Sequence, residues 1–523
     1  MFHQWRPFAV RKRGNMVYLD GNSLTLEEVI RVACEGETVV LSPEGKEQIL
    51  ASRKIVDGIL EEEKPVYGVS TGFGDFSKVF IKKEERSKLQ RNLILSHATG
   101  VGTPLDQEVV RAAMVLRANS LAKGYSGIRL ATVNLLLELL NQKITPVIPC
   151  KGSVGASGDL APLSHMVLVM LGEGEAFVDG KRIPGKEALA AKGLSPVVLS
   201  GKEGLALING TQIMTAVGCI AWKEAVNLMK AADIAAALSL EGLKGTRAAF
   251  DRRISLVRPY PGQLATTENI LKLTEDSAII ASHKHCHKVQ DAYSLRCVPQ
   301  VHGASKEALA QATRTLNIEI NAVTDNPLIM PDTGEAISGG NFHGQPIALV
   351  MDYLKLAIAE IGNISERRTN RLLDMHLSDL PAFLTAFPGV DSGLMITQYV
   401  AASLVSENKV LVHPASADSI PTSANQEDHV SMGTIAARQV REILDNVVNV
   451  LAIEIMAAAQ GIDFLKPLLP GKGTVAAHKA VRAILPHLEK DRFLSPEIKA
   501  IHDFIVSGQL VEIVEAETGS LKV

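Results

Sequence analysis

The sequence predicts a mainly α protein, in which a large helical bundle follows a smaller mixed N-terminal region. The clearest observation is a continuous apolar stripe within residues 437–460, where buried positions recur at three- and four-residue steps: Val440, Ile443, Leu444, Val447, Val448, Leu451, Ile455 and Ala458. Residues 210–245, 302–322, 346–373 and 393–410 show the same spacing. Because only 4% of the residues are aromatic, we expect these helices to pack through Ala, Leu and Val.

The N-terminal region begins with helical segments and a turn-rich loop. Thr25 starts a helix with the form of a capping box, because Glu28 follows three residues later. Residues 67–74 hold three glycines in eight positions and predict a loop. Apolar spacing then predicts helices over residues 106–122 and 128–141.

The rest of this region is irregular. Three prolines and a compact Gly/Ser run interrupt the helical pattern over residues 144–163. An Asp-Gly pair between short apolar runs in residues 175–183 predicts a hairpin. The chain is persistently helical from about residue 203. We therefore expect three parts: a flexible N-terminal extension at 1–15, the mixed region at 16–205 and the long-helix bundle at 206–523.

Composition excludes several classes of protein. With 46% hydrophobic residues, the 523-residue chain is not predominantly disordered. Its formal net charge of −3 argues against a nucleic-acid-binding protein. The most apolar stretch, residues 130–140, is about half as long as a bilayer requires, so we expect no membrane span. Five cysteines without a CxxC pair fit a reducing compartment and predict a cytoplasmic protein.

Two common kinds of cofactor site are not predicted. The sequence has no P-loop, and the glycine spacing over residues 152–158 does not match a dinucleotide-binding loop, so we expect no nucleotide. Residues 283–287 read His-Lys-His-Cys-His and suggest a metal site. Alternating ligands on one short helical segment cannot all face a tetrahedral centre, however, and no second cluster completes a site. We therefore expect no metal.

The most informative segment is residues 156–163, Ala-Ser-Gly-Asp-Leu-Ala-Pro-Leu. It resembles the signature of the aromatic amino-acid ammonia-lyase family, which includes histidine, phenylalanine and tyrosine ammonia-lyases and related aminomutases. The resemblance covers nearly the whole chain from about Met16, and it implies a fumarase/ammonia-lyase-like fold. In that family Ala156-Ser157-Gly158 would cyclise into 4-methylidene-imidazol-5-one (MIO).

The residue types of this tripeptide suit that cyclisation. The amide nitrogen of Gly158 must approach the carbonyl carbon of Ala156, and a glycine allows this because it has no Cβ. Dehydration of Ser157 then leaves a methylidene group, which is an electrophile that no unmodified side chain provides. Without the rest of the signature, the same residues would be interpreted as a turn that caps a helix.

Further blocks of the sequence match the family in order. The resemblance identifies Tyr67 as the catalytic tyrosine of a glycine-rich loop, Asn209 as an asparagine near MIO and substrate, and Phe342 as a residue of the same pocket. A second group, Gln290, Tyr293 and Arg296, is spaced three residues apart, as one helical face would require. The resemblance implies that Arg296 pairs with the substrate carboxylate, a role that suits a planar guanidinium.

Two blocks of the sequence discriminate among members of the family. Glu427 lies in an Asn-Gln-Glu-Asp-His block, and Ser96 precedes His97; both patterns resemble the histidine-specific members most closely. A carboxylate and an imidazole can both hydrogen-bond a substrate imidazole, whereas a phenyl ring offers them no partner. In isolation, Glu427 would be interpreted as a solvated loop charge and His97 as an ordinary polar residue.

The resemblance implies an elimination of ammonia from L-histidine that yields trans-urocanate, as in histidine degradation. Tyr67 is the first choice for the base that removes the β-proton, with Glu427 as a rival or helper, and Tyr293 and Asn209 would support MIO. The resemblance also implies a homotetramer whose active sites combine residues from several subunits.

Three alternatives remain. The first is a tyrosine or phenylalanine ammonia-lyase or aminomutase on the same scaffold. The second is a non-catalytic protein that has kept the bundle, although the tripeptide and Tyr67 are intact. The third is the fold-related fumarase and argininosuccinate lyase group, whose serine loop is not visible in the sequence.

Overall fold

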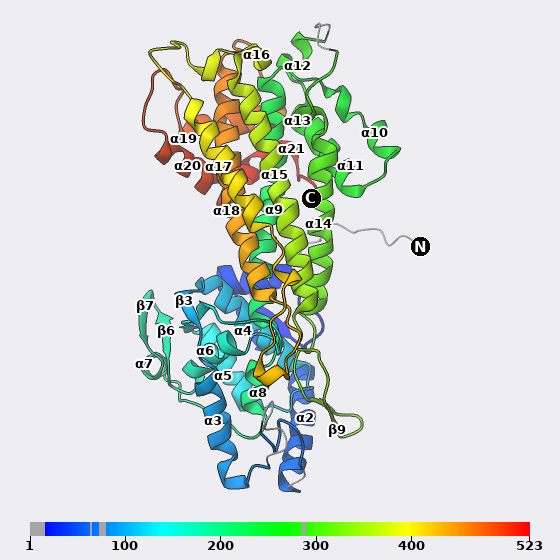
Figure 1. Ribbon diagram of the computed structural model, residues 1–523, viewed down its shortest axis with the longest axis vertical. Helices are drawn as coiled ribbons and strands as arrows, with labels where there is room; N and C mark the ends of the chain where they lie inside the picture. The colour runs from blue at the N-terminus through cyan, green and yellow to red at the C-terminus, as the bar shows by residue number, and fades with distance from the viewer. Residues whose placement is uncertain (1–15, 63–64, 73–79, 285–288) are drawn as a thin grey trace. The chain divides into compact units, whose positions relative to one another are not determined.

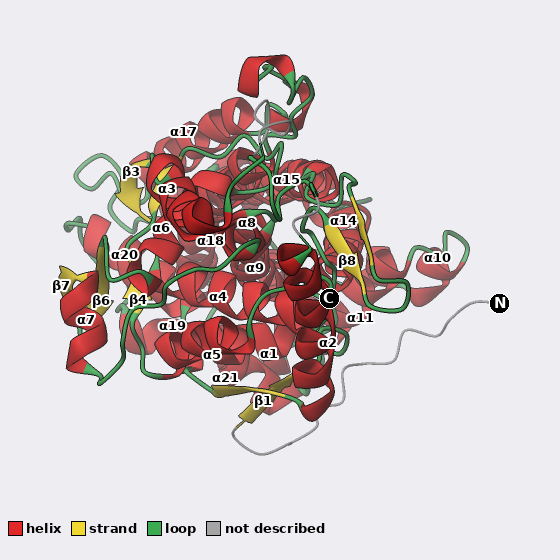
Figure 2. Cartoon of the chain, turned by 90° about the horizontal axis from the view of Figure 1, so that it is seen from below, coloured by secondary structure: helices red, strands yellow, loops and turns green. Residues whose placement is uncertain are grey.

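The computed structural model describes residues 16–62, 65–72, 80–284 and 289–523. The predicted extension at 1–15 lies outside these residues. Helices dominate and strands are few and short, which confirms the predicted mainly α class (Figures 1 and 2). The chain forms two compact units, each built from three segments. Unit 1 comprises Met1–Ile220, Leu316–Gln345 and Asp418–Thr434, and unit 2 comprises Ala221–Thr315, Pro346–Ala417 and Ile435–Val523. The predicted boundary after residue 205 stays a prediction.

The described part of unit 1 begins with a two-stranded parallel sheet, two α-helices and a π-helix. Its first elements are β1 (Met16–Leu19), α1 (Leu26–Ile30), the π-helix η1 (Arg31–Glu35), β2 (Thr38–Leu41) and α2 (Pro43–Glu61). The capping box at the start of α1 is confirmed, because the Thr25 side chain accepts from the Glu28 N–H and the Glu28 carboxylate accepts from the Thr25 N–H. Ser42 caps α2, and the proline that follows it needs no N–H partner at the first helical position.

The central part of unit 1 carries the helices that position the candidate site. In chain order its elements are η3 (Lys83–Glu85), α3 (Arg86–His97), β3 (Val101–Pro104), α4 (Gln107–Ala122), α5 (Leu130–Asn141), β4 (Thr145–Pro146), β5 (Pro149–Lys151), α6 (Leu160–Met170), β6 (Glu175–Val178), β7 (Lys181–Pro184), α7 (Gly185–Ala191) and α8 (Glu203–Ile208). The predicted hairpin is confirmed as β6 and β7, whose turn residues Asp179 and Gly180 both have positive φ. The predicted helices over 106–122 and 128–141 are α4 and α5.

Two later segments complete unit 1. They contain the hairpin β8 (Leu328–Met330) and β9 (Glu335–Ile337) and the 3-10 turn η7 (Ser423–Asn425). Helix α4 is buried along most of its length. It therefore forms the core of this unit.

Four long helices run together in unit 2 for most of their length (Figure 1). They are α9 (Gln212–Gly242), α14 (Val298–Glu319), α15 (Gln345–Leu373) and α18 (Gly433–Asp463). All eight residues of the predicted stripe on α18 are buried. Within unit 2, Glu454 of α18 accepts hydrogen bonds from Ser239 of α9 and Ser365 of α15. The bundle is therefore joined by buried polar pairs as well as by small apolar side chains.

Shorter helices surround these four in unit 2. They are η4 (Arg247–Phe250), α10 (Arg252–Leu256), α11 (Pro261–Leu273), α12 (Ala278–Ser282), α13 (Tyr293–Arg296), α16 (Met375–Ser378), η5 (Ala382–Leu384), α17 (Met395–Leu411), η6 (Ala415–Ala417), α19 (Lys472–Ile484), α20 (Ser495–Val506) and α21 (Gln509–Thr518). Across the described part of the chain, none of the helices combines the length and apolar character needed to cross a bilayer.

Candidate active site

A pocket of about 1250 Å³ lies in unit 1, with walls contributed by segments far apart in the sequence. Seven of the residues singled out in the sequence line it: Tyr67, His97, Ala156, Ser157, Asn209, Phe342 and Glu427. Gly158, the next residue after Ser157, is buried and is not itself among the lining residues. The pocket is large enough for an amino acid, since small-molecule sites usually enclose roughly 300–1,000 Å³.

The Ala156-Ser157-Gly158 tripeptide lies at the entrance to α6, in a conformation that requires glycine. Gly158 has φ +69°, and a Cβ built on it would lie 2.1 Å from the carbonyl oxygen of Gly210. Any other residue here would force the two backbone segments apart. The N–H of Asp159 donates to the same Gly210 oxygen at 2.7 Å. The tripeptide therefore packs tightly against the turn between α8 and α9.

Asn209 and Asp159 fix the tripeptide from two sides. Asn209 ends α8, is 3% exposed, and donates from Nδ2 to the Ser157 carbonyl oxygen at 2.8 Å. Asp159 is fully buried and accepts from Ser153 Oγ, Thr434 Oγ1 and the Met214 N–H at 2.7, 2.6 and 2.9 Å. Burial raises the pKa of the Asp159 carboxyl group, while these three donors lower it. Sequence patterns gave Asp159 no role, although its place directly after the tripeptide was a signal.

Glu427 reaches into the pocket from a tightly closed loop. Its Oε1 accepts from Ser157 Oγ at 2.7 Å, and its Oε2 accepts from Thr422 Oγ1 at 2.8 Å. Backbone hydrogen bonds join Thr422 and Glu427 in both directions, at 2.9 and 3.3 Å. Between them, Ser423, Ala424 and Asn425 have φ of 51°, 52° and 67°. Left-handed conformations of this kind cost about 1–3 kcal/mol each and concentrate at functional sites. This strained loop holds the carboxylate beside the Ser157 hydroxyl group.

His97 lies at the end of α3 and is half-buried. Its Nδ1 is 3.0 Å from Ser96 Oγ. Burial lowers the pKa of the imidazole, while the Leu93 carbonyl and the negative charge of Glu427 raise it, and the net shift is downward. The ring is therefore neutral near pH 7, where it can both donate and accept a hydrogen bond. The pocket thus offers an uncharged imidazole together with a carboxylate.

Tyr67 lies in the predicted glycine-rich loop and is half-buried. Residues 67–72 form a turn and an isolated bridge rather than a helix, and the remaining two loop residues, 73 and 74, lie outside the described part. Elsewhere in the lining, the ring of His343, next to Phe342, stacks on His429 with centroids 5.6 Å apart. The aromatic wall therefore extends beyond the single phenylalanine that the sequence predicted.

Gln290, Tyr293 and Arg296 lie in unit 2 and are not among the described residues that line this pocket. Helix α13 begins at Tyr293, so Gln290 precedes the helix and does not share a helical face with the other two. The Tyr293 side chain is 70% exposed, and the Arg296 guanidinium lies 4.4 Å from its ring centroid. This is the geometry of a cation–π contact.

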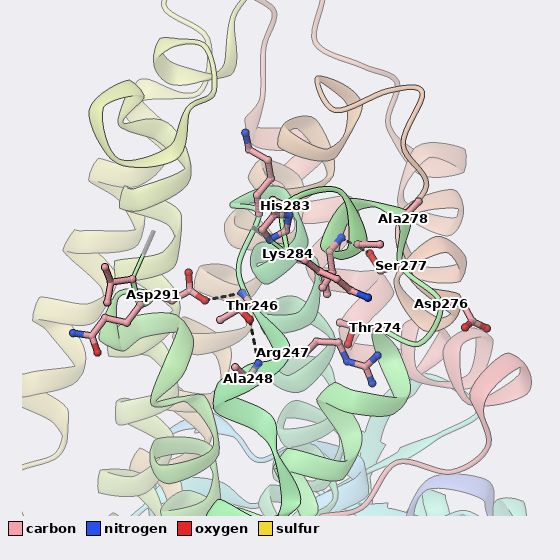
Figure 3. Close-up of a pocket in the computed structure, with 15 residues that line it drawn as sticks. Thr246, Arg247, Ala248, Thr274, Asp276, Ser277, Ala278, His283, Lys284 and Asp291 are labelled. Carbon is pink, nitrogen blue, oxygen red and sulfur yellow. Dashed lines mark hydrogen bonds between the residues drawn. The ribbon is translucent and has the colours of Figure 1, made fainter. Parts of the chain in front are cut away.

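Gln290 borders a second pocket, of about 630 Å³, which belongs to unit 2 (Figure 3). Its lining includes the basic residues Lys244, Arg247, His283 and Lys284 and the acidic residues Asp276 and Asp291. Asp291 accepts from the Thr246 N–H at 2.7 Å (Figure 3). Among the described residues, no three His, Cys, Asp or Glu side chains are grouped as metal ligands. Three residues of the His-rich segment, 285–287, lie outside the described part.

Comparison with known proteins agrees with this geometry. The family model for aromatic amino acid lyases matches residues 24–483. A histidine ammonia-lyase of Alkaliphilus oremlandii (strain OhILAs) is 57% identical over 499 residues, covering 95% of this chain and 98% of the relative. The crystal structure of histidine ammonia-lyase from Trypanosoma cruzi is 42% identical with a TM-score of 0.89, and 96% of each chain is covered.

A tyrosine aminomutase from Streptomyces globisporus is 38% identical with a TM-score of 0.92, covering 97% of this chain and all of that chain (100%). The fold that the resemblance predicted is therefore confirmed. The chain belongs to the aromatic amino acid lyase family.

Proposed function

We propose that this chain is a carbon–nitrogen lyase that eliminates ammonia from L-histidine and releases trans-urocanate. The main support is the contact of the Glu427 carboxylate with Ser157, in a pocket that also contains His97. An imidazole side chain can donate a hydrogen bond to the carboxylate and exchange a second one with a neutral His97. The name histidine ammonia-lyase, carried by a relative that is 57% identical, supports the same substrate.

The Ala156-Ser157-Gly158 tripeptide would form MIO. In that closure the Gly158 nitrogen bonds to the Ala156 carbonyl carbon, and one water leaves with the Ala156 oxygen and the amide hydrogens of Ser157 and Gly158. A second water leaves with the Ser157 hydroxyl group and its Cα hydrogen. The close backbone approach at Gly158 and the hydrogen bond from Asn209 support this fit. The MIO group supplies an electrophilic carbon that activates the substrate amine as a leaving group.

The chain's own residues would bind the substrate and move the proton. Tyr67 would remove the β-proton as the Cα–N bond breaks, while Glu427 and His97 orient the imidazole. Arg296 would bind the substrate carboxylate. Its Nε is buried without a hydrogen-bond partner among the described residues, which supports a role in binding an anion.

The enzyme would be a homotetramer whose active sites combine residues of different subunits. Exposed apolar side chains on α15 and α17, which include Leu349, Leu356, Ile396 and Tyr399, support a protein–protein interface. In such an assembly, the residues of α13 would complete a pocket formed by unit 1 of another subunit. We assign the enzyme to the cytoplasm on the cysteine argument given above.

The direct test follows near-UV absorbance while the purified protein is incubated separately with L-histidine, L-tyrosine and L-phenylalanine. We expect urocanate from histidine and no absorbing product from the other two. Coumarate, cinnamate or a β-amino acid, the last detected by chromatography, would instead indicate the tyrosine or phenylalanine members. Loss of two waters from the peptide that contains residues 156–158, measured by mass spectrometry, tests MIO formation independently of substrate.

A further inference from the structure

A buried guanidinium lies one layer behind the tripeptide. Arg117 belongs to α4 and its side chain is fully inaccessible to solvent. Burial lowers its pKa to about 10, and the charge of Asp325 partly opposes that shift. The cation therefore remains protonated at neutral pH, in the interior of unit 1. Burying a charge is expensive unless its contacts are specific.

The guanidinium holds the turn between α8 and α9. Its Nη1 donates to the Asn209 carbonyl oxygen at 3.1 Å and to Gln212 Oε1 at 2.9 Å. Its Nη2 donates to the carbonyl oxygen of Ala206. The acceptors come from the last turn of α8, from its end and from the first residue of α9. One planar fork thus fixes the path of residues 206–212.

The same turn contacts the tripeptide on two sides. Asn209 donates to the Ser157 carbonyl oxygen, and the Gly210 oxygen accepts from the Asp159 N–H. Gly158 and Gly210 form an isolated parallel bridge. A Cβ on Gly210 would lie 2.5 Å from Arg117 Nη1 and 2.3 Å from Gln212 Oε1. The guanidinium, the turn and the tripeptide are therefore packed in direct succession.

We propose that Arg117 is a positioning residue for ring closure, because it holds residues 206–212 where they press Gly158 toward the Ala156 carbonyl group. This inference rests on the proposed formation of MIO. Ring closure requires the Gly158 nitrogen to approach a carbonyl carbon two residues away, and such reactions depend steeply on how the reacting atoms are held. Loosening the turn would therefore slow maturation before it affects any step of turnover.

A buried ion pair lies near Arg117, close enough for the charge of Asp325 to act on the Arg117 pKa. Lys202 Nζ lies 2.8 Å from Asp325 Oδ2, and both side chains are inaccessible to solvent. Lys202 directly precedes α8. Asp325 directly precedes Asn326, which lines the pocket. Lysine would keep the charge at position 117 but could not reproduce the planar fork. A comparison of Arg117→Lys with Arg117→Met therefore separates the effect of the charge from the effect of the planar geometry.

The test follows loss of two waters from the 156–158 peptide over time after cell-free synthesis. We expect Arg117→Met to lose them about 10²-fold more slowly than the wild type, with Arg117→Lys between the two. The matched control is Arg53→Met, because Arg53 is also buried in unit 1 and donates to two carbonyl oxygens, those of Gly127 and Gly201. Arg53 does not contact the turn, so this variant should lose stability but cyclise at the wild-type rate.

The outcomes separate the inference from the proposed function. Cyclisation of folded Arg117→Met at the wild-type rate, or equal slowing in Arg53→Met at a matched melting temperature, would overturn the role of Arg117. A wild-type peptide that never loses two waters would refute MIO formation instead. If neither Arg117 variant folds, Gln212→Leu decides, because it removes one acceptor of the guanidinium and keeps the charge. Slower water loss in that variant supports the proposal, and an unchanged rate contradicts it.

Discussion

Glu427 accepts two hydroxyl hydrogen bonds, from Ser157 and Thr422. The proposed ring closure removes the Ser157 hydroxyl group, so Thr422 would still hold Oε2 while Oε1 is left to accept from a substrate. A carboxylate in this position favours a substrate that can donate to it, as an imidazole does and a phenyl ring does not. We therefore expect Glu427→Gln to lower kcat/KM for histidine by about 10²-fold and to affect any residual turnover of phenylalanine less. Equal losses for both substrates would remove Glu427 as the selector. Glu335→Gln, an exposed change on β9, is the control.

Tyr67 carries the proposed proton transfer. Replacing its hydroxyl group by hydrogen in Tyr67→Phe should lower kcat by roughly 10²–10⁴-fold, the range for one general base. The 156–158 peptide should still lose two waters, because the phenol does not take part in ring closure. Steady-state kinetics and peptide mass spectrometry measure the two effects separately. Near wild-type turnover would exclude Tyr67 as the base, and Tyr18→Phe, on the exposed face of β1, should leave turnover unchanged.

At the scale of elements, helical spacing predicted α18 and α5, each of which buries a regular apolar face. It also predicted α4, which is buried along most of its length. The Asp-Gly pair likewise predicted the β6–β7 hairpin. The Thr422–Glu427 loop could not be predicted, since three non-glycine residues with positive φ are held by surroundings that spacing does not reveal.

The buried polar contacts around the tripeptide were also invisible to sequence patterns. Asp159 accepts from Thr434, which is 275 positions away along the chain. No sequence pattern indicated the role proposed for Arg117, because its neighbours in α4 have the pattern of an ordinary buried helix. Gln290 was expected on one helical face with Tyr293, but the helix begins only after Ala292. Family resemblance supplied the site residues, and local spacing alone did not reveal how they are held.

The end of α18 is fastened to α19 by one carboxylate. The side chain of Asp463 is 4% exposed and lies within 3.1 Å of His478 Nε2 and within 2.9 Å of both Arg482 Nη2 and His487 Nδ1. Burial alone would raise the pKa of this carboxyl group, but hydrogen bonds from the two histidines and the charge of Arg482 hold it well below its usual value. The folded state therefore keeps the carboxylate charged at a pH where the unfolded chain has begun to protonate it.

This contact predicts a pH-dependent loss of stability. Asp463→Asn should lower the free energy of unfolding at pH 7 by about 3 kcal/mol, because it removes the charge that pairs with Arg482 and the acceptor of the two histidine hydrogen bonds. The pKa is lower in the folded state, so the contribution is complete above about pH 4 and disappears as the pH falls further. In denaturation curves measured between pH 7 and pH 3, the difference in free energy of unfolding between variant and wild type should therefore become smaller as the pH is lowered. A constant difference would contradict the assignment, and Asp503→Asn, at an exposed pair with Lys499, is the control.

At the scale of the whole molecule, the residues of the proposed reaction are divided between the two units. Ser157 and Glu427 share one pocket in unit 1, and their hydrogen bond shows that a single chain supplies both. Arg296 and Tyr293 belong to α13 of unit 2, with the Tyr293 ring exposed. A tetramer with composite sites would give Arg296 and the exposed Tyr293 ring a substrate to bind.

Composite sites predict that two inactive variants restore each other. Ser157→Ala cannot form the ring, and Arg296→Met loses the carboxylate contact, so each should be inactive by itself. When the two are co-expressed, random assembly gives about a quarter of the sites a wild-type unit 1 from one chain and a wild-type unit 2 from another. Urocanate formation should recover to that fraction. Ser157→Ala with Glu427→Gln is the matched control. Both changes lie in unit 1, so the unit 1 part of every site carries one of them and no intact site can form. Absence of recovery in the first pair would mean that each active site is built from a single chain. Equal recovery in both pairs would mean that the recovered activity does not come from composite sites.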